Sequence, residues 1–431
     1  MNSALRAAYA AAGLTARVLA AAAPPNASGK VWRAFAARRG VRERFRRWAV
    51  GGRDPARPLL WVHAPSVGEG LQARPVLTLV RERRPDVQLA YTFYSPSAAS
   101  FAASLDVDVA DYLPFDTRGD ADALLDALRP DALSFSKLDV WPMLAMAAGE
   151  RGVRLALTSA TLSEASSRRG RLATALLHDA YASLDAVGAI DRRDADRLVS
   201  LGVRADRVCV TGDTRYDQVW ARAAAVDRAS TLLAPLASAR PTLVAGSTWP
   251  ADEAMLLPAW QAARAQLPDA RLVIAPHEPT ADHLAPVERW ARGAGLTIAR
   301  LSDAAAPTAD VVLIDRVGVL GELYALATVA FVGGGFHAAG LHSVLEPAAF
   351  GAPVLFGPRW RASRDAELLL AAGGAAAPDD PTTLCAALLR WLGDRAARDG
   401  AGSVARSLVH DGLGAAERSF AMLASLLPPP R

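Results

Sequence analysis

Short apolar runs alternate with amphipathic helical patterns through most of this 431-residue chain, and this alternation restricts the fold more than any other feature. In the first half, the apolar runs lie at 59–63, 89–93, 132–136, 154–158, 186–190 and 208–211. Helical patterns separate them, for example at 70–83, 121–128 and 141–151. Buried strands that alternate with helices form a parallel sheet covered on both faces.

The same alternation starts afresh in the second half of the chain, after a break near 223–240. Expected strands lie there at 242–245, 271–275, 311–314, 330–332 and 354–356. The chain is longer than one hydrophobic core usually serves, and an apolar content of 52% argues against disorder. We therefore predict an α/β fold with two doubly wound, Rossmann-like domains that face a central cleft, where ligands would bind.

Four segments follow from this division. We expect a basic N-terminal arm at 1–50, a first Rossmann-like domain at 51–225 and a second at 236–400. Residues 401–431 are expected to form helices that pack back across the domains. The two cysteines, Cys209 and Cys385, lie far apart without metal-binding spacing, which indicates a reducing compartment.

The N-terminal arm concentrates positive charge. Residues 1–49 hold ten basic side chains and one acidic one, although the net charge of the chain is only +4. Such an arm would meet an anionic surface, membrane or nucleic acid, and we expect membrane rather than nucleic acid. The Ala/Leu-rich segment 4–23 is interrupted by Arg6 and Arg17, so we expect a helix lying on a membrane surface rather than spanning it. An ordinary alanine-rich surface helix is the alternative.

A glycine corner is the most distinctive stretch of the second half. Gly333, Gly334 and Gly335 follow a buried strand, and a helix is expected to start near Ser343. Small residues at a strand end let a ligand approach the backbone closely, and a helix N-terminus offers N–H groups to an anion. Ser343 and Glu346 have the spacing of a capping box. The alternative role for Glu346 is to accept hydrogen bonds from a ribose diol beside a phosphate pocket.

Three charged residues of the first half follow expected strands. Glu69 stands between Gly68 and Gly70 and suits a general base on an acceptor hydroxyl, or it balances a helix dipole. Asp139 follows Lys137, a residue suited to neutralising phosphate; Asp139 would hold a developing charge or act as the N-cap of the next helix, which the pattern favours. Arg215 would stabilise a departing phosphate or pair with Asp213 or Asp217 on the surface.

Polar residues also end the strands of the second half. Ser247 and Thr248 lead into a helix whose N-terminus would suit a phosphate. His277 would bond phosphate or base, or simply pack in a neutral form. His337 and His342 have no acidic partner at metal-binding spacing, so no metal site is expected.

Eight stretches in order resemble the bacterial transferases of 3-deoxy-D-manno-octulosonic acid (Kdo), which act on lipid A precursors. They are HAPSVGEG, LPFD, KLDVWP, VTGDTRYD, GSTWPADE, APHEP, VLGELY and GLHSVLEPAAFGAPVLFGP. Together they cover most of the chain from about residue 57 to residue 358. The basic arm is also similar to the membrane-associating segment of that family.

The resemblance implies a metal-independent, inverting glycosyltransferase of the GT-B type that needs no cofactor. Its donor substrate would be CMP-Kdo and its acceptor a lipid A precursor similar to lipid IVA, in lipopolysaccharide core biosynthesis. The enzyme would lie at the cytoplasmic face of the inner membrane, held to anionic lipid through its N-terminal segment. By position, Glu69 would be the catalytic base, and Asp139 and Arg215 would stabilise the transition state. The donor site would comprise Gly246, Ser247, Thr248, Pro276, His277, Gly321, Glu322, His342, Ser343 and Glu346.

The chain departs from the family pattern at several of these positions. Better-known members carry Glu-Thr-Glu where this chain has Lys137, Leu138 and Asp139, and asparagine where Ser343 stands. Two alternatives remain on the same scaffold. A nucleotide-sugar epimerase would act on a UDP-sugar without an acceptor, and a non-catalytic two-domain binding protein would have no need of Glu69.

Overall fold

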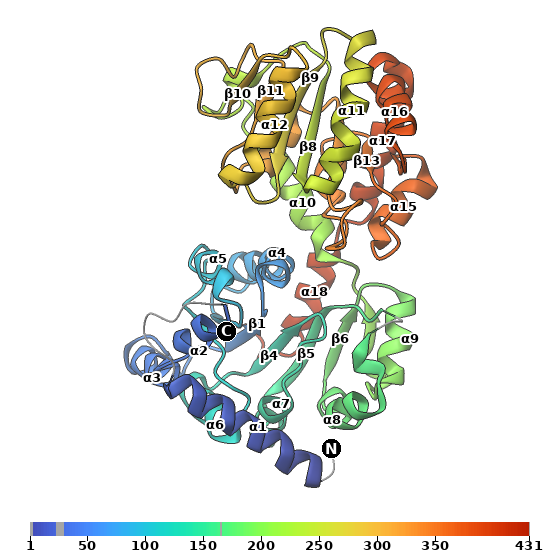
Figure 1. The fold of residues 1–431 in the computed structure, drawn as a ribbon. Coiled ribbons are helices and arrows are strands. Elements are labelled where there is room, and N and C mark those ends of the chain that lie inside the picture. Colours follow the sequence, from blue (N-terminus) through green and yellow to red (C-terminus); the bar gives the residue numbers. More distant parts are fainter. Residues whose placement is uncertain (1–2, 23–29, 164–165, 431) are drawn as a thin grey trace. The chain divides into compact units, whose positions relative to one another are not determined.

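The computed structural model describes residues 3–22, 30–163 and 166–430. The chain divides into two compact units, each built on a seven-stranded sheet whose strands all run parallel (Figure 1). Unit 1 comprises Met1–Gln218 and Leu413–Arg431, and unit 2 comprises Val219–Gly412. Two parallel sheets with helices between their strands confirm the predicted α/β, doubly wound fold.

The sheet of unit 1 has the strand order β3-β2-β1-β4-β5-β6-β7. Its strands are β1 (Leu59–His63), β2 (Gln88–Phe93), β3 (Val109–Tyr112), β4 (Ala132–Ser136), β5 (Arg154–Ala160), β6 (Ala186–Ala189) and β7 (Val208–Val210). Its helices are α1 (Ser3–Ala22), α2 (Lys30–Ala37), α3 (Val41–Gly51), α4 (Val67–Arg83), α5 (Ala99–Ala102), α6 (Arg118–Leu128), α7 (Pro142–Glu150), α8 (Arg171–Ala182), α9 (Arg192–Ser200) and α18 (Ala415–Ala424).

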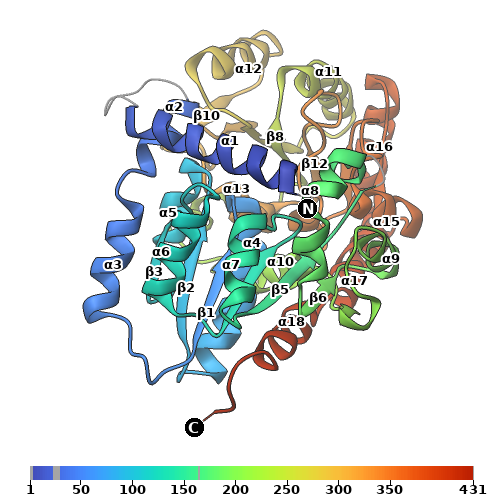
Figure 2. The same ribbon diagram turned by 90° about the horizontal axis from the view of Figure 1, so that it is seen from below.

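Helices cover both faces of this sheet because its central strands are apolar on both sides. Alternate residues of a strand point to opposite faces. Leu59 and Trp61 of β1 pack in the core formed with α3 and α6 to α9. Leu60 and Val62 pack in the core formed with α4, α5 and α18. Figure 2 shows α18, from the far end of the chain, beside β5 and β6.

The sheet of unit 2 has the order β10-β11-β9-β8-β12-β13-β14. Its strands are β8 (Thr242–Thr248), β9 (Arg271–Pro276), β10 (Ile298–Arg300), β11 (Val311–Leu313), β12 (Val329–Val332), β13 (Val354–Phe356) and β14 (Ala375–Ala376). Its helices are α11 (Pro250–Gln266), α12 (Ala281–Gly293), α13 (Leu320–Leu323), α14 (Leu345–Ala349), α15 (Arg364–Ala372), α16 (Pro381–Gly393) and α17 (Arg395–Asp411). Helix α10 (Thr214–Ala224) begins in unit 1 and ends in unit 2.

Each sheet has a switch point, where successive strands are added on opposite sides of the first strand. In unit 1 this switch point lies between β1 and β4, and in unit 2 it lies between β8 and β12. Loops that leave neighbouring strands there turn to opposite faces of the sheet, which opens a crevice at the carboxyl ends of the strands. Ligands of doubly wound sheets bind at these edges.

The N-terminal arm folds against unit 1. Helix α1 is anchored by a hydrogen bond from the Tyr9 hydroxyl to Asp116 (2.9 Å) and by an ion pair between Arg17 and Asp120 (3.9 Å). Figure 1 shows α1 running alongside α6, which carries Asp120. Within the described part of the chain, no helix is long and apolar enough to cross a membrane.

Candidate functional site

The predicted catalytic residues of unit 1 lie at the carboxyl edge of its sheet. Glu69 follows β1, Asp139 follows β4 and Arg215 follows β7. Because all these strands are parallel, their carboxyl ends share one edge. Strands β1 and β4 are neighbours at the switch point, so Glu69 and Asp139 flank the position where doubly wound sheets bind ligands.

Glu69 is held by two polar partners in the first turn of α4. The Lys137 ammonium lies 3.0 Å from Glu69 Oε1, and the Ser66 hydroxyl donates to Oε2. Burial would raise the pKa of Glu69, but the Ser66 hydroxyl and Lys137 outweigh it and lower that pKa below the usual value. An ionised carboxylate at this place can accept a proton from a hydroxyl group. The same position also suits the helix-dipole alternative.

Asp139 lies in the loop between β4 and α7 and is surrounded by donors. Trp141 Nε1 donates to its Oδ2 (3.0 Å), Arg168 Nη2 lies 3.3 Å from Oδ1, and His63 Nε2 lies 3.4 Å from Oδ2. Burial would raise the pKa of Asp139, but these partners, His63 foremost, lower it. The N-cap interpretation of Asp139 is wrong, because α7 begins at Pro142 and its N-cap is Trp141.

Arg215 is paired with Asp213, one of the two aspartates that the alternative interpretation named, but this aspartate is buried and not on the surface as expected. Its Nε and Nη2 lie 2.8 and 2.6 Å from Asp213 Oδ2. Asp213 Oδ1 also accepts from Gln72 Nε2 (3.2 Å), and Gln72 stands one turn after Glu69 on α4. Burial would raise the pKa of Asp213, but Arg215 lowers it. Helix α4 thus carries both Glu69 and Gln72, the residue that donates to the aspartate paired with Arg215. The side chain of Arg215 is 40% exposed.

The glycine corner of unit 2 is fixed by a buried carboxylate. Asp252, on α11, accepts from the backbone N–H of Gly334 (2.7 Å) and of Phe336 (2.9 Å). Gly334 has a φ of 90°, which favours glycine, and a Cβ at Gly333 would collide with the backbone of Ser247. The corner after β12 therefore lies against the end of β8, across the switch point.

A tryptophan brings together three histidines beside this corner. The Trp249 ring stacks between His277 (4.5 Å between centroids) and His337 (4.2 Å), and its Nε1 lies 3.2 Å from His342 Nε2. Burial, and then the neighbouring His277, lower the pKa of His342. The structure thus places His277 and His342 in one aromatic cluster, 4.6 Å apart. Stacked rings of this kind suit contact with another planar ring.

Other predicted donor-site residues lie close to this cluster along the ends of β8 and β9. The N–H of His277 donates to the carbonyl of Thr248 (2.9 Å), which joins the end of β9, at Pro276, to the end of β8. Gly246 also lies near the end of β8, and a Cβ there would collide with the Tyr324 hydroxyl. Glycine is therefore required at this position by packing alone.

Ser343 and Glu346 do not form the capping box that their spacing predicted. Helix α14 begins at Leu345, its N-cap is Val344, and that cap makes no side-chain hydrogen bond. Glu346 instead lies 3.8 Å from Arg222, a residue of α10. Burial raises the pKa of Glu346, an effect that Arg222 partly opposes.

Arg222 also connects Gly321 with Glu346. A Cβ at Gly321 would collide with the Arg222 guanidinium, so the arginine lies directly over this glycine. The next residue, Glu322, lies half-buried in the first turn of α13. The predicted donor-site residues therefore form two groups in unit 2, one around Trp249 and one around Arg222.

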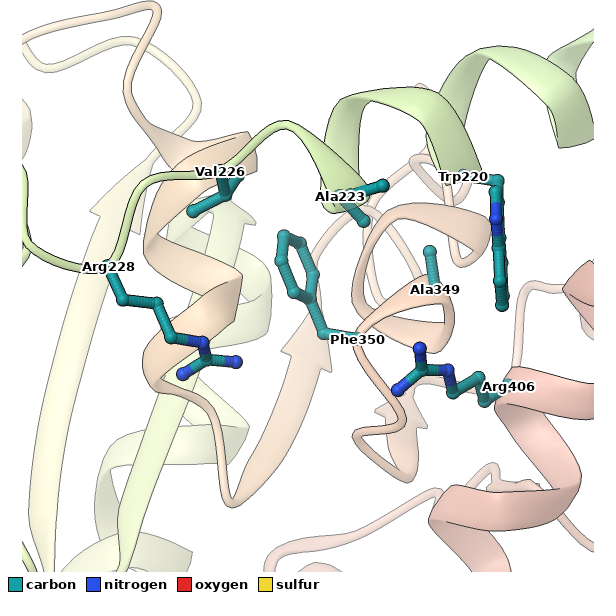
Figure 3. A pocket seen from close by; sticks show the side chains of 8 residues that line it. Trp220, Ala223, Val226, Arg228, Ala349, Phe350 and Arg406 are labelled. Carbon is teal, nitrogen blue, oxygen red and sulfur yellow. The ribbon is translucent and has the colours of Figure 1, made fainter.

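A cavity of about 310 Å³ in unit 2 lies at the opposite end of α14 from Ser343, beside the part of α10 that follows Arg222. Figure 3 shows Phe350 between the Arg228 and Arg406 side chains, with Trp220 on the far wall. No predicted site residue lines this cavity. Among the residues with described positions, no group of three or more His, Cys, Asp and Glu side chains is placed to hold a metal ion.

Several residues around these sites were not predicted to belong to them. Trp249 and Asp252 stand inside the GSTWPADE stretch, and Trp141 inside KLDVWP. Because other residues of these stretches were predicted to belong to the sites, their position in the sequence could have identified them. His63 ends β1 and opens the HAPSVGEG stretch, a usable signal, whereas Arg168 and Arg222 lie in no strand-end pattern that pointed to a ligand. The proximity of these two arginines to the sites comes only from the order of strands and helices in space.

Comparisons with known proteins agree with this picture. A family model described as "3-Deoxy-D-manno-octulosonic-acid transferase (kdotransferase)" matches residues 39–218. The 3-deoxy-D-manno-octulosonic acid transferase of Bordetella pertussis is 33% identical over 353 residues, 79% of each chain. The enzyme of the same name from Haemophilus influenzae is 25% identical, over 69% of this chain and 70% of the relative.

Solved structures support the fold. UDP-GlcNAc 2-epimerase from Neisseria meningitidis, bound to UDP-GlcNAc, superposes with a TM-score of 0.60 at 13% identity, covering 83% of this chain and 99% of the other. The same enzyme from Methanocaldococcus jannaschii gives 0.56 at 12% identity, covering 82% and 99%. At such identities the likeness shows the fold alone, whereas the sequence relatives support a transferase over an epimerase or a binding protein. The chain therefore belongs to the 3-deoxy-D-manno-octulosonic acid transferase family and is a glycosyltransferase.

Proposed function

We propose that this enzyme transfers Kdo from CMP-Kdo to a hydroxyl group of a lipid A precursor, with inversion and without a metal ion. In this reaction the acceptor oxygen bonds to the anomeric carbon of Kdo, the bond from that carbon to the phosphate of CMP breaks, and CMP leaves. Glu69 takes the proton of the attacking hydroxyl. The observation that carries this role is the paired Glu69 carboxylate at the switch point of unit 1.

Arg215 is proposed to stabilise the negative charge that develops on the departing phosphate, and Asp139 the positive charge that develops at the anomeric carbon. Two observations support these roles: the positions of the two residues and the charges of their side chains. Asp139 shares the loop after β4 with Lys137, the partner of Glu69. Arg215 keeps a half-exposed guanidinium although it pairs with Asp213. A cation oriented by a buried carboxylate needs little reorganisation when negative charge develops near it.

Unit 2 is proposed to bind the CMP-sugar through the groups around Trp249 and Arg222. The stacked rings of Trp249 and His277 suit the cytosine base. The carboxylate of Glu346 suits the ribose hydroxyl groups, and Gly246, Ser247, Thr248, Pro276, Gly321, Glu322, His342 and Ser343 complete the site. Metal independence remains part of the proposal, and turnover that survives excess EDTA is its test.

The N-terminal arm is proposed to rest on the cytoplasmic face of the inner membrane. Leu14 and Val18, one turn apart on α1, are 53% and 67% exposed, and Val31 and Trp32 on α2 are 64% and 42% exposed. Arg6 lies exposed on the same helix as Leu14. An apolar stripe with basic residues beside it suits the headgroup region of an anionic bilayer.

The experiment that tests the reaction measures CMP release from CMP-Kdo, generated in situ, with and without a tetra-acylated disaccharide lipid A precursor. We expect release that depends on the acceptor, together with a mass gain on the lipid that counts the sugars transferred. Binding of the donor without release would point to a different acceptor or sugar. The absence of donor binding would overturn the proposal.

The role of Glu69 is tested by Glu69→Gln, which keeps the size of the side chain and removes the base. Turnover should fall about 10²- to 10⁴-fold, the usual contribution of a general base, while donor binding stays unchanged. Glu82→Gln is the matched control, because Glu82 is exposed on the same helix. Near-normal turnover of Glu69→Gln would exclude this residue as the base.

A further inference from the structure

Lys137 has an unusual backbone conformation at the point where it meets Glu69. Its φ is 59°, in the left-handed region that residues other than glycine rarely adopt. This conformation costs a residue with a Cβ roughly 1 kcal/mol. The backbone is fixed there, because the N–H of Lys137 donates to the carbonyl of Thr158 on the neighbouring strand β5 (2.9 Å). Glycine would adopt this backbone conformation without strain. The presence of lysine in its place therefore points to a role for the lysine side chain.

The side chain of Lys137 reaches the Glu69 carboxylate from a different strand end. The two residues are 68 positions apart in sequence, and the distance between Nζ and Oε1 is 3.0 Å. The lysine side chain is 40% exposed and that of Glu69 is 16% exposed, so the pair is open to solvent on one side. A substrate hydroxyl group can therefore approach the carboxylate without breaking the ion pair.

The other groups that face Glu69 are few. Ser66, at the start of α4, donates to the second carboxylate oxygen. Tyr91, on β2, faces Glu69 from the sheet, and its own pKa is raised by burial and by the charge of Glu69. Of these neighbours only Lys137 brings a positive charge to the carboxylate. Its removal would leave a half-buried carboxylate with only neutral donors, the Ser66 hydroxyl and a backbone N–H.

We propose that Lys137 is the positioning residue of the catalytic base: it fixes the Glu69 carboxylate through Oε1 and keeps it ionised and ready to accept the acceptor proton. The inference rests on the proposed role of Glu69 and extends it to a second residue. The lowered pKa of Glu69 agrees with this pairing. Lys137 acts through Glu69 and needs no contact with the reacting atoms.

The test compares Lys137→Gly and Lys137→Arg with the natural enzyme in the pH dependence of kcat for Kdo transfer. Lys137→Gly removes the ammonium, and relief of the left-handed strain partly offsets the stability lost with the ion pair. The acid limb of its profile should move up by about half to one pH unit, a modest shift because the pair is partly exposed. Lys137→Arg keeps a cation and should keep the profile. Arg192→Met, which removes an exposed cation of α9, is the control.

A second measurement does not depend on turnover. Carboxyl ¹³C NMR of enzyme labelled at glutamate, with Glu69→Gln used to assign the signal, follows the titration of Glu69 directly. We expect its midpoint to rise in Lys137→Gly and to stay in Lys137→Arg. Unchanged midpoints and parallel pH profiles would overturn the role of Lys137. A natural enzyme without Kdo transfer, or a fully active Glu69→Gln, would instead overturn the proposed function while the NMR titration still reported on the ion pair.

Discussion

At the scale of single residues, most carboxylates near the sites have a cation or several donors beside them. Glu69, Asp139 and Asp213 each gain partners that outweigh the effect of burial on their pKa values. Asp116 differs, because burial prevails there and raises its pKa to about 6. It accepts from the N–H groups of Met143 and Leu144 and from the Tyr9 hydroxyl, but no cation meets it in these hydrogen bonds.

Asp116 should therefore make the stability of unit 1 depend on pH. A group whose pKa is raised by folding binds a proton in the folded state that the unfolded chain has already lost, so the free energy of unfolding falls as pH rises from about 4 to about 6. A shift of about two units corresponds to roughly 3 kcal/mol as an upper estimate. Chemical unfolding measured across this range should show a smaller loss of stability in Asp116→Asn than in the natural protein. Parallel curves for the two proteins would contradict the raised pKa.

At the scale of secondary-structure elements, the difference between the centre and the edge of a sheet explains which strands could be predicted from the sequence. The central strands were predicted because both of their faces are largely apolar, as in β1 and β9. The three strands that were not predicted, β3, β10 and β14, all lie at sheet edges. They are short and half-exposed, as in Val109–Tyr112, so they lack a continuous apolar run.

Helix α1 illustrates an element whose apolar residues are not all used in packing. Leu14→Ser combined with Val18→Ser should weaken binding to vesicles that contain anionic phospholipid, because both side chains are exposed and available to the bilayer. Two aliphatic side chains are worth about 2–4 kcal/mol, so affinity in a vesicle sedimentation assay should fall at least about tenfold. Val199→Ser, which changes an exposed residue of α9, should have no effect. Equal binding by the double variant would exclude α1 as the contact surface.

At the scale of the whole molecule, the chain leaves unit 1 at Gln218 and returns to it at Leu413. Helix α18 then completes the core of unit 1 with Leu423, which is 1% exposed, and Leu427 packs beyond it. Asp217 accepts from the N–H groups at the start of this last segment (2.9 and 3.1 Å). Unit 1 is therefore discontinuous in sequence, whereas unit 2 is a continuous segment.

Deletion of residues 413–431 should consequently destabilise unit 1 and spare unit 2. Removing a buried leucine costs about 2–5 kcal/mol, and the deletion removes Leu423 together with its neighbours. Hydrogen exchange measured by mass spectrometry should show faster exchange in the β4 peptide of unit 1 and unchanged exchange in the β8 peptide of unit 2. Deletion of 429–431 alone is the control. Slow exchange of β4 in the long deletion would show that α18 is dispensable for this core.

The sequence by itself determined the fold class, the family, most central strands and the strand ends where the site residues lie. Those features depend on local patterns, since an apolar strand followed by three glycines is visible over a few residues. It also placed Glu69 and Asp139 after the strands that flank the switch point. Such conclusions require only the pattern of residues within a short window of the sequence.

The capping interpretations of Asp139 and Ser343 failed because local spacing does not decide where a helix begins. Only the tertiary structure decided the long-range partners of the charged and aromatic side chains. Lys137 beside Glu69, His63 beside Asp139 and His342 beside Trp249 lie 68, 76 and 93 residues away in sequence. Such contacts depend on the order of strands in the sheet and on the side-chain conformations at their ends, and no local period of the sequence encodes either of them.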